Sequence, residues 1–188
     1  MKSIRTLLTA LALLTVSTTG SWAEEDHRCK LPQAGPEHAW LQQLVGEWTS
    51  ETEAYMEPGK PPIKSIGTES IQPLGKFWTI SEIKSTMMDM PFSGNFTLGY
   101  DTDKKKYVGT WVDSMTGHLW NYEGSVDATG KILTLETEGQ CPMRPGKLSK
   151  FKEVVEIKSP DHKIFSSSIL GDDGKWVTMM TSHAHRKQ

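Results

Sequence analysis

The sequence predicts an all-β protein, an antiparallel up-and-down β-barrel of about ten strands that follows a short N-terminal helix. From Glu47 onward the side chains alternate with period two, as in strands with one packed and one solvent-facing side. Turns that contain Gly, Asp or Pro separate these stretches and are too short for crossover helices, so neighbouring strands run antiparallel. Closure into a barrel removes the two exposed edges of an open meander. A two-sheet sandwich is the alternative, because it has the same alternation.

Residues 1–23 are predicted to be an export signal. Lys2 and Arg5 supply positive charge, residues 7–16 form an apolar stretch, and small residues precede a cleavage point after Ala23. The mature protein is therefore expected to be periplasmic or secreted.

The next segments predict a flexible lead-in and then one helix. Residues 24–36 are polar, contain two prolines and have no periodicity. Residues 37–45 place four apolar side chains on one face of a short helix, and Gly46 ends it. The four side chains are those of Trp40, Leu41, Leu44 and Val45.

The strands follow the helix. In the first, Trp48, Ser50 and Thr52 face one way, whereas Thr49 and Glu51 face the other. The predicted strands span residues 48–57, 64–72, 76–86, 93–100, 106–113, 118–126, 131–138, 148–158, 162–170 and 175–185. With no long linker in between, residues 37–188 are predicted to form a single domain.

The charge balance argues against a nucleic-acid partner. The chain has 188 residues with 21 basic and 23 acidic side chains, and removal of Lys2 and Arg5 leaves 21 − 2 = 19 basic ones. No basic surplus remains to neutralise phosphates. Beyond the signal, no apolar run approaches the roughly 20 residues that a membrane-spanning helix needs. The oligomeric state is left open by the sequence.

Cys29 and Cys141 are the two cysteines. In an oxidising compartment such a pair often forms a disulfide. Closing a loop of roughly 110 residues would stabilise the fold by up to about 4–5 kcal/mol. Two unpaired thiols are the alternative, because Cys29 lies in a lead-in segment of undefined path. The separation matches no zinc-binding pattern.

The Gly-x-Trp at residues 46–48 resembles the entry motif of the lipocalin and calycin barrels. A wider pattern resembles a bacterial family of uncharacterised proteins, the domain of unknown function DUF1579. That resemblance covers residues 37–187 and implies a calycin-like β-barrel, similar in plan to nitrobindin and the fatty-acid-binding barrels, but no activity. The lipocalin resemblance also implies that Arg186 stacks on Trp48. The matching segments are residues 37–48, 98–101, 107–112, 122–124 and 186–187.

Tryptophan and methionine side chains suggest a lined cavity. Large rings give contact area, and thioethers adapt to irregular ligands. The candidate lining residues are Trp48, Trp78, Trp111, Trp120 and Met180. We therefore predict a non-enzymatic, lipocalin-like barrel that binds a small apolar or amphipathic ligand. The alternatives are a haem- or metal-binding barrel that uses histidine and a filled barrel with a scaffold or interaction role. No catalytic residue is predicted, since the serines at 166–168 lack a nucleophile elbow, and the sequence identifies no cofactor.

Two histidines near the C-terminus are candidate metal ligands. Alternation places His183 and His185 on one face of the last predicted strand, about 6–7 Å apart. Zinc or iron would need further ligands, for which His118 is the candidate. If that face points inward, the nitrobindin resemblance implies that His183 is an axial haem ligand. The alternative is that both histidines are exposed near the C-terminus without a metal.

Overall fold

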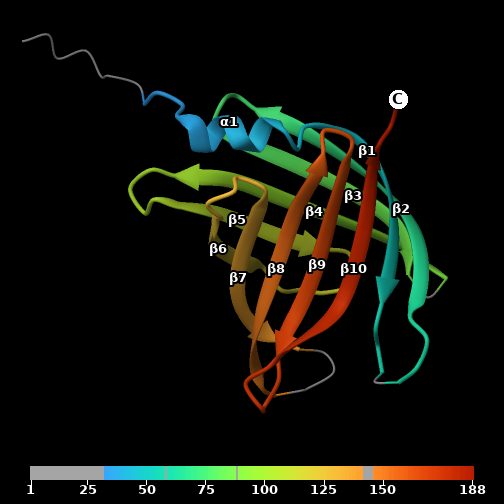
Figure 1. The fold of residues 1–188 in the computed structure, drawn as a ribbon. Coiled ribbons are helices and arrows are strands. Elements are labelled where there is room, and N and C mark those ends of the chain that lie inside the picture. The colour runs from blue at the N-terminus through green and yellow to red at the C-terminus, as the bar shows by residue number, and fades with distance from the viewer. Residues whose placement is uncertain (1–31, 58, 88, 142–145) are drawn as a thin grey trace, which may run out of the picture. The chain divides into compact units, whose positions relative to one another are not determined.

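One helix and ten strands form the described part of the computed structural model, which comprises residues 32–57, 59–87, 89–141 and 146–188 (Figure 1). Each predicted strand is present, with ends that differ by a few residues. The elements are α1 (Pro36–Gln42), β1 (Gly46–Ala54), β2 (Ile63–Leu74), β3 (Trp78–Met87), β4 (Met90–Asp101), β5 (Lys106–Asp113), β6 (Trp120–Val126), β7 (Ile132–Gln140), β8 (Leu148–Ser159), β9 (His162–Leu170) and β10 (Trp176–Arg186).

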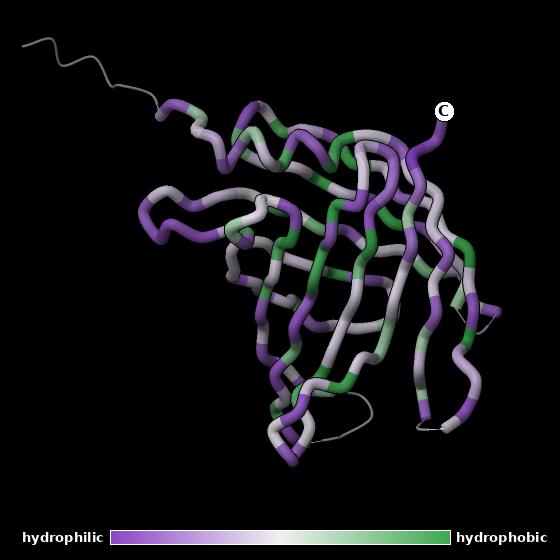
Figure 2. Tube along the Cα trace, viewed as in Figure 1, coloured by the Kyte–Doolittle hydropathy of each residue, from purple (hydrophilic) through white to green (hydrophobic). Residues whose placement is uncertain are grey.

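The sheet closes on itself, which confirms the predicted barrel over the sandwich. Each strand pairs antiparallel with its neighbour in sequence, and β1 also pairs with β10. The closing register runs from Trp48 opposite Arg186 to Ala54 opposite Met180. Polar and apolar residues alternate along the strands (Figure 2), as a barrel wall with an inner and an outer face requires.

The junction between α1 and β1 explains where the helix ends. The helix stops at Gln42 rather than at residue 45, and tighter turn bonds follow it, from the Leu44 amide to the Leu41 carbonyl (3.1 Å). Gly46 then adopts a φ of +136°, and a Cβ there would lie 2.2 Å from Nη1 of Arg186. Only glycine tolerates both this backbone conformation and this close approach.

An apolar cluster fills the barrel end that α1 covers. Leu41 of the helix, Trp48 of β1 and Leu133 of β7 are almost wholly buried in it. The Trp40 indole joins the cluster and donates a hydrogen bond to the Gly130 carbonyl (2.8 Å). This end is thus closed by side chains.

In the part of the chain that the structure describes, no helix has the length and apolar character that crossing a membrane requires.

Arg186 stacks on Trp48, as predicted. Its Cζ lies 4.2 Å from the indole centroid. The guanidinium also donates hydrogen bonds to three carbonyls, those of Val45 (2.6 Å), Gln43 (3.1 Å) and Pro160 (3.1 Å). One side chain from the last strand therefore ties the α1–β1 junction to the β8–β9 turn.

Glycines make room for the largest inward-facing rings. A Cβ on Gly94 would lie 2.1 Å from the Trp111 ring, and one on Gly139 would lie 2.4 Å from the Trp120 ring. Each indole thus lies directly over the backbone of another strand. A large side chain on one strand packs where the other strand has a glycine and therefore no side chain.

We expect Gly94→Ala to lower the free energy of unfolding by about 1–3 kcal/mol, because the added methyl group forces the Trp111 ring to move. Gly117→Ala is the matched control, since a Cβ at Gly117 meets nothing within 4 Å. Urea unfolding of the two variants measures the difference. Equal stability of both variants would show that the Trp111 ring relocates without cost.

Candidate ligand-binding site

Polar side chains point into the barrel between two apolar clusters. The first cluster lies under α1, and the second comprises Cys141, Phe151 and Ile169. The strand registers place a group of inward-facing polar residues between them, which we call the polar belt. The polar belt consists of Glu69, Ser81, Glu153, Lys163, Ser167 and Ser182.

Several inward-facing side chains are only half-buried. Thr52, Ile83, Trp111 and Phe165 all point toward the barrel axis, yet none is fully shielded from solvent. In a barrel filled by its own side chains such positions would be buried, as Trp48 and Leu133 are. The inner wall beyond the α1 cluster is therefore less completely packed than the cluster itself.

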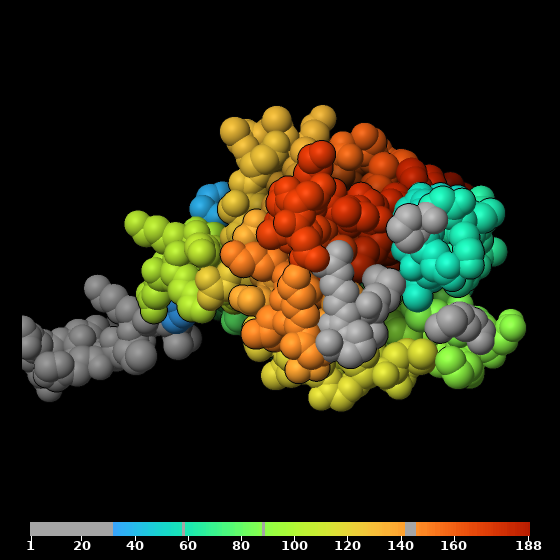
Figure 3. Space-filling model, turned by 90° about the horizontal axis from the view of Figure 1, so that it is seen from below, coloured from blue at the N-terminus to red at the C-terminus, as the bar shows by residue number. Residues whose placement is uncertain are grey.

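The barrel end away from α1 has an apolar rim. Seen from that side, the tips of the β1–β2, β3–β4 and β9–β10 hairpins lie at this end (Figure 3). Ile63 and Met90 belong to inward-facing positions but are 41% and 46% exposed. Such a rim suits the entry of a molecule with an apolar part.

Glu153 is the least satisfied group in the polar belt. It faces Leu135 on β7 and Ser167 on β9, and the Ser167 hydroxyl donates to Oε1 (3.0 Å). Its Oε2 is shielded from solvent and has no hydrogen-bond partner among the described residues. Burial raises the pKa of Glu153 to about 8, and the hydrogen bond from Ser167 opposes that shift. Glu153 is therefore mostly protonated at neutral pH.

We expect stability to fall as pH rises from about 4.5 to about 8, and Glu153→Gln to flatten this dependence. The folded pKa lies above that of the unfolded chain, so between the two values the folded state holds the extra proton. Raising the pH therefore favours unfolding, and glutamine has no proton to lose. Thermal unfolding of the parent and variant across this range measures the effect. Identical pH profiles would contradict the prediction.

Lys163 and Glu69 form the satisfied part of the polar belt. Lys163 Nζ lies 2.7 Å from Glu69 Oε2, and the two side chains are 8% and 18% exposed. The same ammonium lies 4.7 Å from the centroid of the Trp48 ring, so Lys163 and Arg186 both lie over that ring. Because the two charges neutralise each other, this part of the polar belt does not require a charged ligand.

The predicted lining residues divide between the two faces of the barrel wall. Trp111, Trp120 and Met180 point inward and are partly buried. Trp48 also points inward but is packed in the α1 cluster. Trp78 lies on the outer face, with its ring over Gly99, because its neighbour Thr79 takes the buried inward position; the expectation that Trp78 lines the interior is corrected.

The histidines lie on the outer wall. Their neighbours Ser182 and Ala184 take the inward positions, so His183 and His185 point outward. This corrects the idea of His183 as a haem ligand inside the barrel. His162 of β9 joins them, with 3.4 Å between its Nε2 and Nδ1 of His183 and 4.3 Å between its ring centroid and that of His185.

His118 does not complete a metal site with this pair. Its ring packs on Trp120 at 4.6 Å between centroids, and no group of three or more His, Cys, Asp or Glu in the described ranges is placed to hold a metal ion. The metal site remains a prediction that rests on His183. We expect a metal bound to the parent to be lost in His183→Ala. Elemental analysis tests this, and equal metal content in both proteins, or none in either, would contradict it.

Cys141 is buried beside Phe151 and Ile169, and no described residue forms a disulfide with it. Cys29 and the export signal lie outside the described residues. The disulfide thus remains a prediction.

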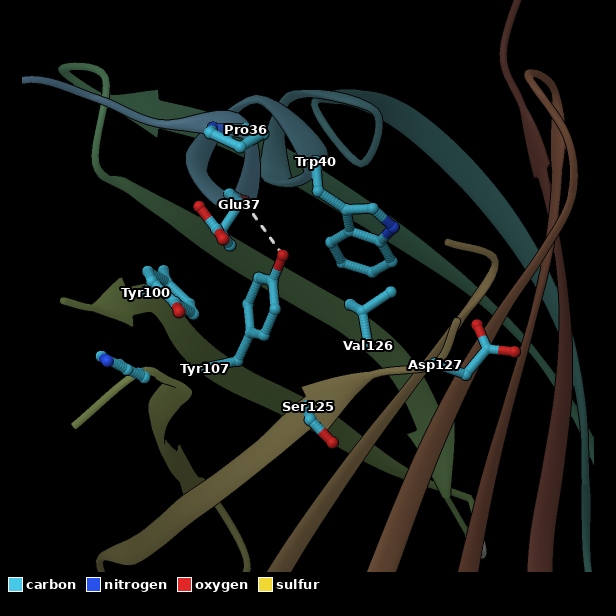
Figure 4. A pocket seen from close by; sticks show the side chains of 9 residues that line it. Pro36, Glu37, Trp40, Tyr100, Tyr107, Ser125, Val126 and Asp127 are labelled. Carbon is cyan, nitrogen blue, oxygen red and sulfur yellow. Dashed lines mark hydrogen bonds between the residues drawn. The ribbon is translucent and has the colours of Figure 1, made fainter. Parts of the chain in front are cut away.

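A hollow lies at the α1 end of the barrel, between α1 and strands β4 to β6 (Figure 4). It measures about 350 Å³, and Trp40, Tyr100 and Tyr107 form its aromatic wall. The Tyr107 hydroxyl donates to the Glu37 carbonyl (3.1 Å), and burial raises the pKa of Tyr107 to about 12. Asp127 accepts hydrogen bonds within its own turn, from Thr129 and from backbone amides. These polar groups already have protein partners, so the hollow is a weaker candidate than the polar belt.

The family described as "Protein of unknown function (DUF1579)" matches residues 33–186, nearly the whole described chain. The chain belongs to this family. No curated protein matches the sequence of this chain.

Solved structures resemble the DUF1579 barrel in fold. Rv2717c from M. tuberculosis is 14% identical, with a TM-score of 0.59 over 83% of this chain and 100% of that chain. The S-type phycobiliprotein lyase CPES from Guillardia theta is 14% identical, with a TM-score of 0.52 over 84% of this chain and 99% of that chain. At this identity the likeness shows a shared barrel architecture.

Sequence analysis of the DUF1579 chain missed the polar belt. Phe151, Glu153, Val155 and Ile157 share one face of β8, so Glu153 is a carboxylate in an otherwise apolar row. Such a polar residue at an apolar position was the available signal. The pairing of Lys163 with Glu69 could not be predicted from the sequence pattern. The two residues are 94 positions apart and come together only in the closed barrel.

Proposed function

We propose that this DUF1579 protein binds one small amphipathic molecule inside its barrel. The observation that carries the proposal is the half-buried inner wall beside Glu153, whose Oε2 lacks a partner among the described residues. A buried carboxyl oxygen without a partner is costly, and a ligand group that reached Oε2 from the half-buried wall would satisfy it. Barrels of this size have room for one small ligand.

The inner wall suits a molecule with distinct polar and apolar parts. Val155 and Phe165 lie next to Glu153 on the inner face, and Trp111 and Ile83 are half-buried across the barrel. The fold is shared with the S-type phycobiliprotein lyase CPES. A barrel of this architecture can therefore have a role other than that of a scaffold, which supports the proposal.

The proposal includes export, as residues 1–23 suggest. The protein would then act in the periplasm or outside the cell. Cell fractionation together with N-terminal sequencing tests this part separately, with a mature chain that begins at Glu24 as the supporting result.

Binding is tested with the neutral fluorescent probe N-phenyl-1-naphthylamine. We expect the parent to enhance its fluorescence saturably and Ile83→Trp to abolish the enhancement, because Ile83 points inward and a larger ring would fill the interior. Ile80→Trp is the control, since Ile80 lies on the outer face of the same strand and is 39% exposed. Native mass spectrometry and organic extraction of the purified protein then identify any resident molecule. No binding by the parent, or equal binding by both variants, would contradict the proposal.

A further inference from the structure

Few inward-facing side chains of the described strands carry charge. The carboxylates are Glu69, Asp113 and Glu153, and the cations are Lys163 and Arg186. Each of these groups except Glu153 has an oppositely charged partner or several hydrogen bonds from the protein. The groups whose charge is already balanced have less need of a ligand.

Both inward cations are matched. Lys163 is paired with Glu69 at 2.7 Å. Arg186 lies at the closed end, where it donates to the carbonyls of Val45, Gln43 and Pro160. No inward-facing cation of the described strands therefore remains available to neutralise an anionic ligand.

Asp113 is also matched. It accepts hydrogen bonds from the Trp111 indole (2.9 Å) and from the amides of Met115 and Thr116 (both 2.8 Å). Glu153 has one hydrogen bond, from Ser167, and an Oε2 that has none from the described residues. It is the one inward-facing carboxyl of the described strands with a solvent-shielded oxygen that has no hydrogen-bond partner.

An aromatic pair also faces the interior. Tyr122 of β6 points inward and is buried. The Tyr122 ring packs edge-to-face on Phe96, with 5.7 Å between centroids. Ring faces attract cations and do not attract anions.

We infer that the ligand of this barrel carries a cationic amine at its polar end and that the Glu153 carboxylate binds it. This inference rests on the proposed function. An ammonium donates hydrogen bonds to Oε2 and supplies the positive charge that balances the ionised carboxylate. A carboxylate ligand would find no available cation, and the ionised form of Glu153 would repel it.

The inference is tested with three ligands that share one alkyl chain: octylamine, octan-1-ol and octanoate. The quenching of tryptophan fluorescence, cross-checked by calorimetry, gives their dissociation constants. We expect octylamine to bind at least about tenfold more tightly than octan-1-ol, the range for a hydrogen bond to a charged group. We expect octanoate to bind most weakly. The preference for the amine should grow from pH 6 to pH 8, because Glu153 releases its proton when the amine binds.

Glu153→Gln should bring the affinities for octylamine and octan-1-ol to within about threefold of each other. Glu156→Gln is the matched control, because Glu156 lies on the outer face of the same strand and pairs with Lys158. This control should keep the parent's preference.

The outcomes separate the two proposals. Equal or tighter binding of octanoate, or a preference for the amine that survives in Glu153→Gln, would overturn the inference and leave the ligand-binding barrel intact. Binding of none of the three ligands, together with failure of the neutral probe, would overturn both.

Discussion

Replacing Trp48 with alanine is expected to lower the free energy of unfolding by about 3–5 kcal/mol, the range for removing a large buried aromatic side chain. The side chain is 1% exposed, and its indole nitrogen donates to the Leu44 carbonyl (2.9 Å). Arg186 and Lys163 both lie over its ring. The substitution thus opens a cavity under α1, leaves a carbonyl without its partner and removes the surface on which two cations pack.

Trp176→Ala is the control for this prediction. Trp176 lies at the start of β10, is 36% exposed and touches Lys152. Its removal should cost much less, since little apolar surface is returned to water. Urea unfolding of both variants gives the comparison. Similar losses in the two variants would mean that the α1 cluster does not dominate stability.

Lys163→Met is expected to lower the free energy of unfolding by about 3–5 kcal/mol, because it leaves the carboxylate of Glu69 inside the barrel without its partner. Replacing both residues, as Lys163→Met with Glu69→Leu, should recover much of the loss. An apolar pair of similar volume avoids the cost of desolvating two charges.

Lys64→Met is the matched control for the buried pair. Lys64 pairs with Glu53 at 2.9 Å, but its side chain is 75% exposed, so solvent screens the interaction and little change is expected. A double-mutant cycle on Lys163 and Glu69 measures their coupling. A single variant as stable as the parent would show that water reaches Glu69 freely.

The strand pattern made most of the fold predictable, because inward and outward positions alternate without interruption along most strands. One exception lies at the end of β8, where the register shifts between Ile157 and Ser159. The other is β10, where a register shift between Thr178 and Met180 changes which side chains share a face. Counting by two across that shift groups Val177 and Met179 with His183, and the inward face could not be assigned from the sequence. Local irregularities of this kind depend on the partner strand, which a single segment does not reveal.

The candidate site was less predictable than the fold, because it depends on which side chains meet across the barrel. The tryptophans predicted an interior lined for a ligand, but Trp78 faces outward and Trp48 is buried within the α1 cluster. The polar belt joins residues from strands far apart in sequence, and a bare alternation pattern carries no information on their distance. A polar residue in an apolar row, as at Glu153, is the signal that deserves priority in such chains.

The closure of β1 on β10 has a consequence for the order in which the chain can fold. Arg186 bonds to the Val45 carbonyl across 141 positions of sequence, so the seam forms only after the whole of β10 has been synthesised. Until then, β1 and β9 each present an unpaired edge, and Trp48 lacks the guanidinium that covers it. The barrel of a nascent chain therefore cannot close before β10 is available. Because β1 and β10 are far apart in sequence, their pairing is expected to be slow relative to the formation of the hairpins. A chaperone or translocation machine that binds the incomplete chain would therefore bind an open antiparallel sheet with two unpaired edge strands, not a closed barrel.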